Sequence, residues 1–202
     1  MKAAITSMFE QELAREPDAD AFLRAESMSD YESAEETYKA LVDRGSVLSM
    51  VNLGRLCEQE GNGTKGGNNE QPELWYKRAV DAGSAVATLY YGSFLFRIGA
   101  YDRAREIFSV GRSRGYSPSI VRLANLYLKG LGVERDYSKA RALLEQAAEL
   151  GNLWAKVALA AMTVTLGRTA IVRFKGLLMG IAAGVHLRIE RWRDPYSERL
   201  KK

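Results

Sequence analysis

Cysteine and histidine are almost absent from this sequence, and their scarcity excludes whole kinds of chemistry. The 202 residues contain one cysteine, Cys57, and one histidine, His186. A single cysteine cannot close an intramolecular disulfide, and a lone thiol does not provide the ligand cluster that zinc sites use. We therefore expect a reducing compartment and no metal or other cofactor. Any catalytic triad would have to form around His186.

Long apolar runs and enzyme signatures are also lacking. The most apolar stretch, GLLMGIAAGVHL at 176–187, spans about a dozen residues, whereas a helix needs about 20 to cross a bilayer. The start of the chain turns acidic at Glu10 and Glu12 and does not fit a signal peptide, so we expect a cytoplasmic protein. No phosphate-binding loop, dinucleotide fingerprint, GxSxG or HExxH motif occurs. Acid–base groups are sparse, which disfavours a hydrolase and predicts that the protein is not an enzyme.

Composition and charge then describe a globular chain with two different ends. Hydrophobic residues make up 47% and charged residues 27% of the sequence, which is typical of an ordinary folded domain. Residues 1–50 carry 5 Lys/Arg against 11 Asp/Glu, and residues 151–202 carry 10 against 3. The basic residues of the last block are spread out rather than run together, so we expect no nucleic-acid partner. An acidic end and a basic end on the same chain predict weak, salt-sensitive self-association.

Two sequence markers recur with the same period. Glycines follow helix-like segments at Gly45, Gly83, Gly115, Gly151 and Gly184, at intervals of 38, 32, 36 and 33 residues. An apolar residue followed by a small one repeats in step, at Leu53-Gly54, Tyr91-Gly92, Leu123-Ala124 and Leu159-Ala160. A period in the mid-thirties is typical of stacked helix pairs, each of which buries its apolar face against its neighbours. The glycine of each pair suits the end of a helix.

Each unit also predicts its own core. The small residue of the first helix should allow a close approach, and the second helix carries one large apolar side chain seven residues before the closing glycine. That offset of two helical turns places the side chain on a buried face. The four residues concerned are Tyr38, Tyr76, Phe108 and Leu144.

One unit resembles a known repeat family. The string LANLYLKGLGVERDYSKARALLEQAAELGN at 123–152 closely resembles the Sel-one-like repeat, with its G-x-G-V between helices, an aspartate, and Lys-Ala opening the second helix. The segment GAYDRAREIF at 99–108 is instead similar to a tetratricopeptide repeat. The resemblance covers roughly residues 30–184. It implies an all-α, right-handed α-solenoid of about five antiparallel helix pairs, and a protein-binding adaptor or scaffold of a kind common in bacteria.

These features divide the chain into three regions. We expect an N-terminal capping helical region at 1–30, Sel-one-like and tetratricopeptide-like repeats at 31–184, and a basic C-terminal cap or tail at 185–202. The polar connection EQEGNGTKGGNNEQPE at 58–73 predicts a mobile loop that ends near Pro72, a residue suited to a first helical turn. The apolar segment after Trp154 predicts a buried terminal helix pair.

A binding groove follows from the repeat geometry. The first helices of stacked pairs line the concave face, and positions beside the buried apolar-small marker should point into the groove. Such a polar, aromatic and basic groove suits a protein or an extended, acidic peptide, although an ordinary solvated helix surface explains each residue singly just as well. The predicted residues are Asn52, Arg55, Tyr90, Ser93, Arg97, Arg122, Asn125 and Lys129.

A second function remains open beside the adaptor. The C-terminal region combines the apolar run at 176–187 with dispersed arginines. Such a region can dock on a membrane surface without crossing it. The alternative is therefore a membrane-peripheral component of an envelope or polysaccharide assembly.

Overall fold

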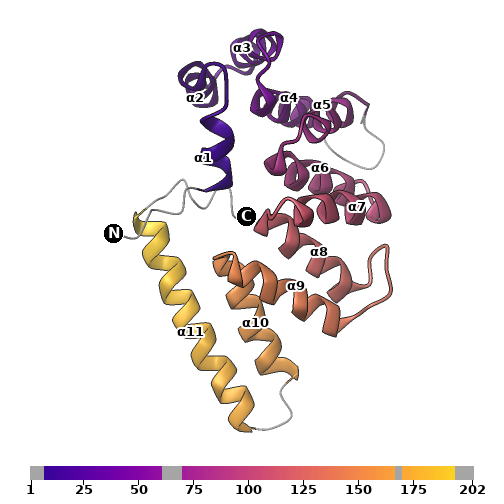
Figure 1. Ribbon diagram of the computed structural model, residues 1–202, viewed down its shortest axis with the longest axis vertical. Helices are drawn as coiled ribbons and strands as arrows, with labels where there is room; N and C mark the ends of the chain where they lie inside the picture. Colours follow the sequence, from indigo (N-terminus) through magenta and orange to yellow (C-terminus); the bar gives the residue numbers. More distant parts are fainter. Residues whose placement is uncertain (1–6, 61–69, 167–169, 194–202) are drawn as a thin grey trace. The chain divides into compact units, whose positions relative to one another are not determined.

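The computed structural model describes residues 7–60, 70–166 and 170–193, and within these ranges it contains helices and no strand. Figure 1 shows the helices in chain order. They form two compact units, Met1–Val110 and Gly111–Lys202. The helices are α1 (Met8–Leu13), α2 (Ala19–Ser27), α3 (Tyr31–Asp43), α4 (Val47–Glu60), α5 (Glu70–Asp81), α6 (Ala85–Arg97), α7 (Tyr101–Ser113), α8 (Ser117–Lys129), α9 (Tyr137–Glu149), α10 (Leu153–Leu166) and α11 (Ala170–Arg193).

Glycine ends the second helix of each central pair, as the sequence predicts. Gly45, Gly83, Gly115 and Gly151 have φ angles of 93°, 95°, 73° and 84°, a left-handed conformation that costs a residue without Cβ little. The amide after each glycine donates to the carbonyl five residues earlier, for example Ser46 to Leu41 at 2.9 Å. This bond is the mark of a Schellman ending, which satisfies the last carbonyls of the helix.

The fifth glycine of the series does not end a helix. Gly184 lies inside α11, which continues to Arg193. Unlike the other four glycines, Gly184 does not have a positive φ angle. The predicted boundary between residues 184 and 185 therefore falls within one continuous helix, because the segment that follows Gly184 contains no helix-breaking residue until after Arg193.

The predicted core residues are buried. Tyr38, Tyr76, Phe108 and Leu144 are between 0% and 4% exposed. A Cβ added at Gly54 would lie 2.8 Å from the ring of Tyr76, and one at Gly92 would collide with the ring of Phe108. The small residue of the first helix thus makes room for the large residue of the second, which explains why both markers share a period.

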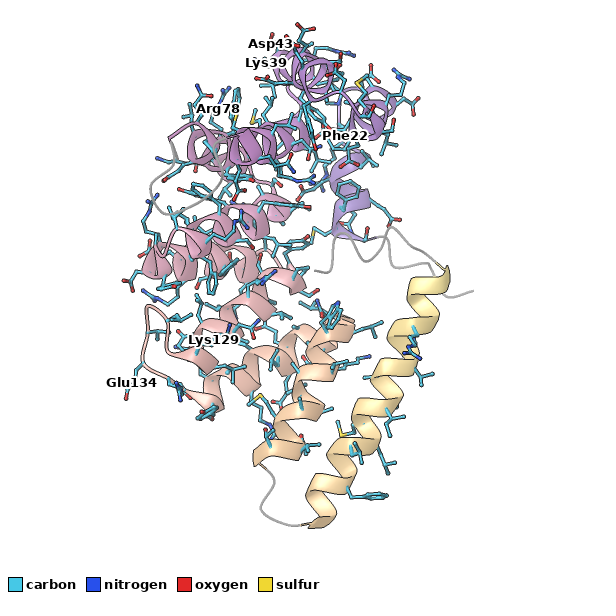
Figure 2. The ribbon with its side chains drawn as sticks, turned by 180° about the vertical axis from the view of Figure 1, so that it is seen from behind. Phe22, Lys39, Asp43, Arg78, Lys129 and Glu134 are labelled. Atoms are coloured by element: carbon cyan, nitrogen blue, oxygen red, sulfur yellow. The ribbon has the colours of Figure 1, made fainter. Side chains whose placement is uncertain are left out.

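The Sel-one-like turn lies in the second unit between α8 and α9. Gly130 and Gly132 of this turn have φ angles of 68° and 62°, and Asp136 caps α9 by accepting from the Lys139 amide at 2.8 Å. Figure 2 labels Lys129, the last residue of α8, and Glu134, which lies within the turn. In the first unit the equivalent connection is only partly described. Pro72 lies in the first turn of α5, as expected, but both ends of the predicted loop, 58–60 and 70–73, are helical, and its middle, 61–69, lies outside the described residues.

The N-terminal region caps the first unit through its carboxylates. Glu12 accepts from the amides of Ala85 and Val86 at 2.7 and 3.1 Å, and Glu16 accepts from those of Val47 and Leu48 at 3.1 and 2.9 Å. These amides open α6 and α4, where a helix has unpaired N–H groups and a partial positive charge. The segment that carries Glu12 and Glu16 therefore caps the N-termini of α6 and α4.

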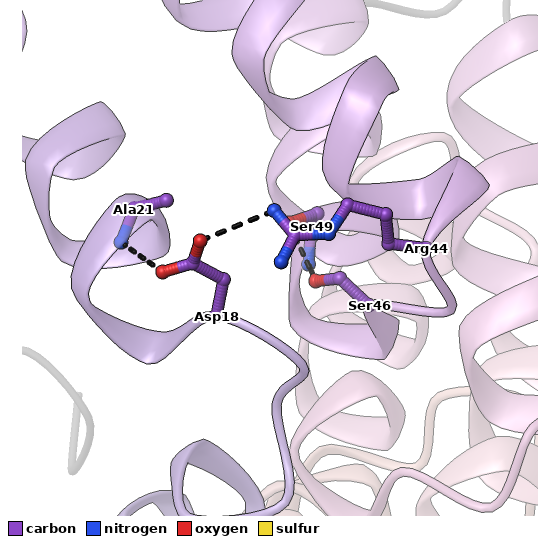
Figure 3. Close-up of polar contacts among 5 residues, drawn as sticks. All are labelled: Asp18, Ala21, Arg44, Ser46 and Ser49. Carbon is purple, nitrogen blue, oxygen red and sulfur yellow. Dashed lines mark hydrogen bonds and ion pairs between the residues drawn. The ribbon is translucent and has the colours of Figure 1, made fainter.

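Asp18 makes a second link in the same region. Figure 3 shows its carboxylate between the amide of Ala21, at 2.9 Å, and the guanidinium of Arg44, at 3.1 Å. The first bond caps α2, and the second reaches the turn between α3 and α4. The backbone N–H of Ala21 is the main cause of the lowered pKa of Asp18, and Arg44 adds to it.

The last helix pair is less buried than the sequence predicts. We expected α10 and α11 to be buried as a terminal pair, but six large apolar side chains of α11 are between 44% and 61% exposed. Small residues make the contact between the two helices instead: a Cβ at Gly176 would lie 2.9 Å from the Val164 amide, and one at Gly180 would lie 3.5 Å from Ala160. The exposed residues are Phe174, Leu177, Leu178, Met179, Ile181 and Val185.

Candidate functional site

A hollow of about 450 Å³ opens in the first unit between α4, α5 and α6. Four of the predicted groove residues line it, and all four come from the first helices of their pairs, α4 and α6. Three further residues complete the lining. The full set is Arg55, Glu58, Gln59, Tyr76, Tyr90, Ser93 and Arg97.

Glu58 is the acidic centre of this hollow. Its side chain is 12% exposed and forms an ion pair with Arg97, and its other oxygen accepts from the Tyr76 hydroxyl at 2.9 Å. Burial raises the pKa of Tyr76 well above its usual value, and the charge of Glu58 acts in the same direction. The phenol is therefore a neutral donor, and the Glu58 carboxylate holds two walls of the hollow together.

Arg55 also lines the hollow, one turn before Glu58 on α4, and two neighbours hold it. Its Nη1 donates to Oδ1 of Asn52 at 3.0 Å, and its guanidinium lies 5.6 Å from the centre of the Tyr90 ring, a cation–π distance. Glu26 lies at the edge of ion-pair range, 4.0 Å away. A guanidinium has five N–H donors, so Arg55 keeps donors for a ligand while these contacts fix its plane.

Asn52 has a different place from the one the sequence predicts. We expected it to face the groove, whereas the structure leaves it only 6% exposed. Asn52 therefore positions Arg55 through their hydrogen bond and is too buried to contact a ligand. A polar residue next to the apolar-small marker looks like a surface residue in the sequence. Its burial depends on how α4 packs against other helices.

A similar cluster lies near the hollow in the same unit. Tyr91 donates to Glu73 at 2.9 Å, and Arg103 donates to the Tyr91 hydroxyl at 3.0 Å and pairs with Glu73. Burial, and then the bond to Glu73, raises the pKa of Tyr91 to about 12. The rings of Tyr76 and Tyr91 stack with centroids 6.4 Å apart, so the two clusters are joined through their aromatic rings.

The three predicted residues of α8 lie in the second unit. Arg122, Asn125 and Lys129 are spaced by three and four residues and share one face of the helix. Arg122 and Lys129 are exposed and Asn125 is half-buried. The structure thus gathers the predicted site residues of the first unit around one hollow and aligns those of the second along one helix.

Three lining residues were missed by sequence reasoning. Glu58 and Gln59 fall in the polar connection that we expected to be a loop, but α4 continues through them to Glu60. Tyr76 was predicted as core, which is correct for its ring, yet its hydroxyl reaches the hollow. The helical spacing of Arg55, Glu58 and Gln59 is the signal that could have extended the site.

The described part of the chain brings together no group of three or more His, Cys, Asp or Glu residues that could hold a metal ion. His186 is exposed on α11, and the half-buried thiol of Cys57 lies 3.8 Å from Oε1 of Gln71. None of the helices described is both long enough and apolar enough to span a membrane.

The helix pairs, their glycine endings and the small-to-large contacts define an all-α protein of the helical-repeat solenoid class. Within that class, residues 47–84 and 117–152 match the Sel1 repeat, which is the Sel-one-like repeat expected from the sequence. The chain therefore contains two Sel1-like repeats. The matched segments correspond to α4–α5 and α8–α9, and the tetratricopeptide-like segment at 99–108 lies between them.

Two solved structures from bacteria share this fold. A protective antigen of uropathogenic Escherichia coli with an SLR fold has a TM-score of 0.63 and 16% identity, over 88% of this chain and 40% of its own. A Sel1 repeat protein from Oxalobacter formigenes has a TM-score of 0.61 and 20% identity, over 86% of this chain and 74% of its own. This chain thus spans well under half of the E. coli protein. No curated protein matches the chain in sequence.

Proposed function

We propose that this protein is a non-catalytic adaptor that binds an extended, acidic segment of a partner protein in the hollow between α4, α5 and α6. Sel1 repeats generally mediate protein–protein interactions, and proteins built from them are typically non-catalytic scaffolds. The observation that carries the proposal is the convergence of Arg55, Tyr90, Ser93 and Arg97 on one hollow.

The charges inside the hollow favour a ligand carboxylate at Arg55. Arg97 is already paired with Glu58, so its charge is balanced within the protein. Arg55 is held through a neutral amide and an aromatic ring, and its nearest carboxylate is 4.0 Å away. A guanidinium whose plane is fixed in this way binds a carboxylate with little further loss of conformational entropy.

Location and source are parts of the same proposal. A single cysteine suits a reducing cytoplasm, and both structural neighbours come from bacteria. We therefore place the adaptor in the cytoplasm of a bacterium. Fractionation of the source cells, with the chain detected by an antibody, tests this placement.

Selection from a displayed library of random peptides tests the binding function. Selected peptides should be rich in Asp and Glu, and the Arg55→Ala variant should bind them about tenfold or more weakly, because a hydrogen bond to a charged group contributes about 1.5–3 kcal/mol. Ser93→Phe should also weaken binding by filling the hollow. Arg141→Ala is the matched control, since Arg141 is an exposed arginine of α9. Equal binding by all three variants would contradict the proposal.

A further inference from the structure

The exposed apolar residues of α11 form one continuous face. Phe174, Leu177, Leu178, Ile181 and Val185 follow one another at spacings of one, three or four residues, and at about 100° per residue they fall on one side of the helix. Met179 lies about 140° around the helix from Phe174, so it is outside this side. We call the five residues Phe174, Leu177, Leu178, Ile181 and Val185 the α11 apolar face.

The contact with α10 keeps this face outward. Gly176 and Ala183 are buried, and Gly176 and Gly180 lie against α10. These small residues occupy the side of α11 opposite to the apolar face. Figure 2 shows side chains of α11 that project away from α10. Turning α11 to bury its large side chains would bring them against a backbone that only glycine allows so close.

The charge around the face identifies its partner. Residues 150–189 contain five Lys or Arg and no Asp or Glu, and Arg188, which is exposed, continues the face one turn beyond Val185. Basic residues occur in α11 on both sides of the apolar segment, at 173 and 175 and at 188, 191 and 193. Two copies meeting face to face would bring positive ends together in either direction, whereas an anionic surface would complement both ends.

The chemistry of the face favours lipid over a folded protein. Between 176 and 187 the sequence has no Asn, Gln, Ser or Thr, although protein interfaces usually contain about one hydrogen bond per 100–200 Å². From Phe174 to Val185 the face is about 17 Å long at 1.5 Å per residue, well short of the ~30 Å hydrocarbon core of a bilayer. Such a helix lies along a membrane surface.

We propose that the α11 apolar face docks this protein on membranes containing anionic phospholipid, with α11 parallel to the surface. The large apolar side chains enter the boundary between headgroups and acyl chains, and the flanking basic residues meet the lipid phosphates. This activity is independent of the peptide-binding hollow, which lies in the other unit. It would bring a bound partner to the membrane.

Flotation with lipid vesicles tests this proposal on the full chain. Vesicles of phosphatidylcholine alone are compared with vesicles containing about 30% phosphatidylglycerol, at about 0.1 M and about 0.5 M salt. The test variant is the triple Leu178→Gln, Ile181→Gln and Val185→Gln, with Arg188→Gln for the charge. The matched control is the triple Leu23→Gln, Leu74→Gln and Leu150→Gln, because these leucines are 44%, 55% and 50% exposed on other elements.

The expected result is binding to the anionic vesicles that falls about tenfold in the test triple and stays unchanged in the control triple. Arg188→Gln and high salt should each weaken binding severalfold. Circular dichroism checks that every variant keeps its helices. No binding to anionic vesicles, equal binding to both vesicle types, or equal binding by the test triple would overturn the proposal. A dimer that forms without lipid, and that the test triple dissociates into monomers, would overturn it as well, because a second copy would then cover the face.

Discussion

At the scale of single residues, stability depends on the room that small residues leave for large ones. The Gly92→Ala change adds helix propensity worth up to about 1 kcal/mol. The new methyl group, however, would collide with the ring of Phe108, which is 1% exposed. Because overpacking a close-packed core costs about 1–3 kcal/mol, we expect a net loss of stability in urea unfolding.

The Gly184→Ala change is the matched control for this prediction. Gly184 also lies within a helix, but a Cβ there would meet nothing within 4 Å. The same substitution should therefore be neutral or stabilising. Equal effects at both positions would mean that helix propensity, rather than the contact with Phe108, decides the outcome.

Alkaline pH should reveal the buried tyrosine cluster. Burial and the bond to Glu73 raise the pKa of Tyr91 from 10.0 to about 12. The folded state then holds this proton more tightly than the unfolded state, so its contribution is complete below pH 10 and is lost as the pH rises toward 12. Absorbance of phenolate should show a late step near pH 12 that shrinks in Tyr91→Phe. A Tyr91→Phe variant that keeps the full absorbance step would contradict this prediction.

At the scale of elements, the N-terminal carboxylates should control individual helix ends. Removing the charge of Glu12 with Glu12→Gln weakens bonds to the amides of Ala85 and Val86. Charge-assisted bonds of this kind contribute about 1.5–3 kcal/mol. Hydrogen exchange at these two amides should therefore accelerate, while exchange at Val47 and Leu48, which bond to Glu16, changes less.

The reciprocal variant provides the control. Glu16→Gln should accelerate exchange at Val47 and Leu48 and affect Ala85 and Val86 less. If both variants accelerate hydrogen exchange at all four amides equally, the N-terminal region detaches as a unit. The two carboxylates would then not act on separate helices.

Local patterns were sufficient to predict the helix pairs, and non-local contacts were not predictable. The glycine endings and the buried residues Tyr38, Tyr76, Phe108 and Leu144 follow from spacing within one unit. Glu12 meets Ala85 across 73 residues, and no periodicity indicates such a contact. Likewise, the composition of α11 predicts burial, but which of its sides is buried depends on its glycines.

The candidate site was predicted in part for the same reason. Arg55, Tyr90, Ser93 and Arg97 occupy repeat positions that spacing can identify. Glu58 was missed because its polar surroundings resemble a loop, although the helix continues through it. Asn52 was predicted to be exposed and is buried, since its environment is set by tertiary packing.

At the scale of the whole molecule, the uneven charge should affect association. Residues 1–50 have a net charge of −6 and residues 151–202 have a net charge of +7. Opposite charges on two copies attract at low salt, but the Debye length falls to about 10 Å at 0.1 M. Sedimentation velocity should show weak association that disappears as salt rises. A dimer insensitive to salt would point to an apolar contact instead.

The most direct test of the central claim is photo-crosslinking from the hollow itself. A photoreactive residue at Gln59, an exposed residue at the hollow, should crosslink a defined protein partner in the source cells, and Arg55→Ala in the same chain should abolish that product. The same residue placed at Arg141, exposed on α9, should not give it. Equal products from both positions, or a product at Gln59 that survives Arg55→Ala, would contradict the claim that this protein binds its partner through the hollow between α4, α5 and α6.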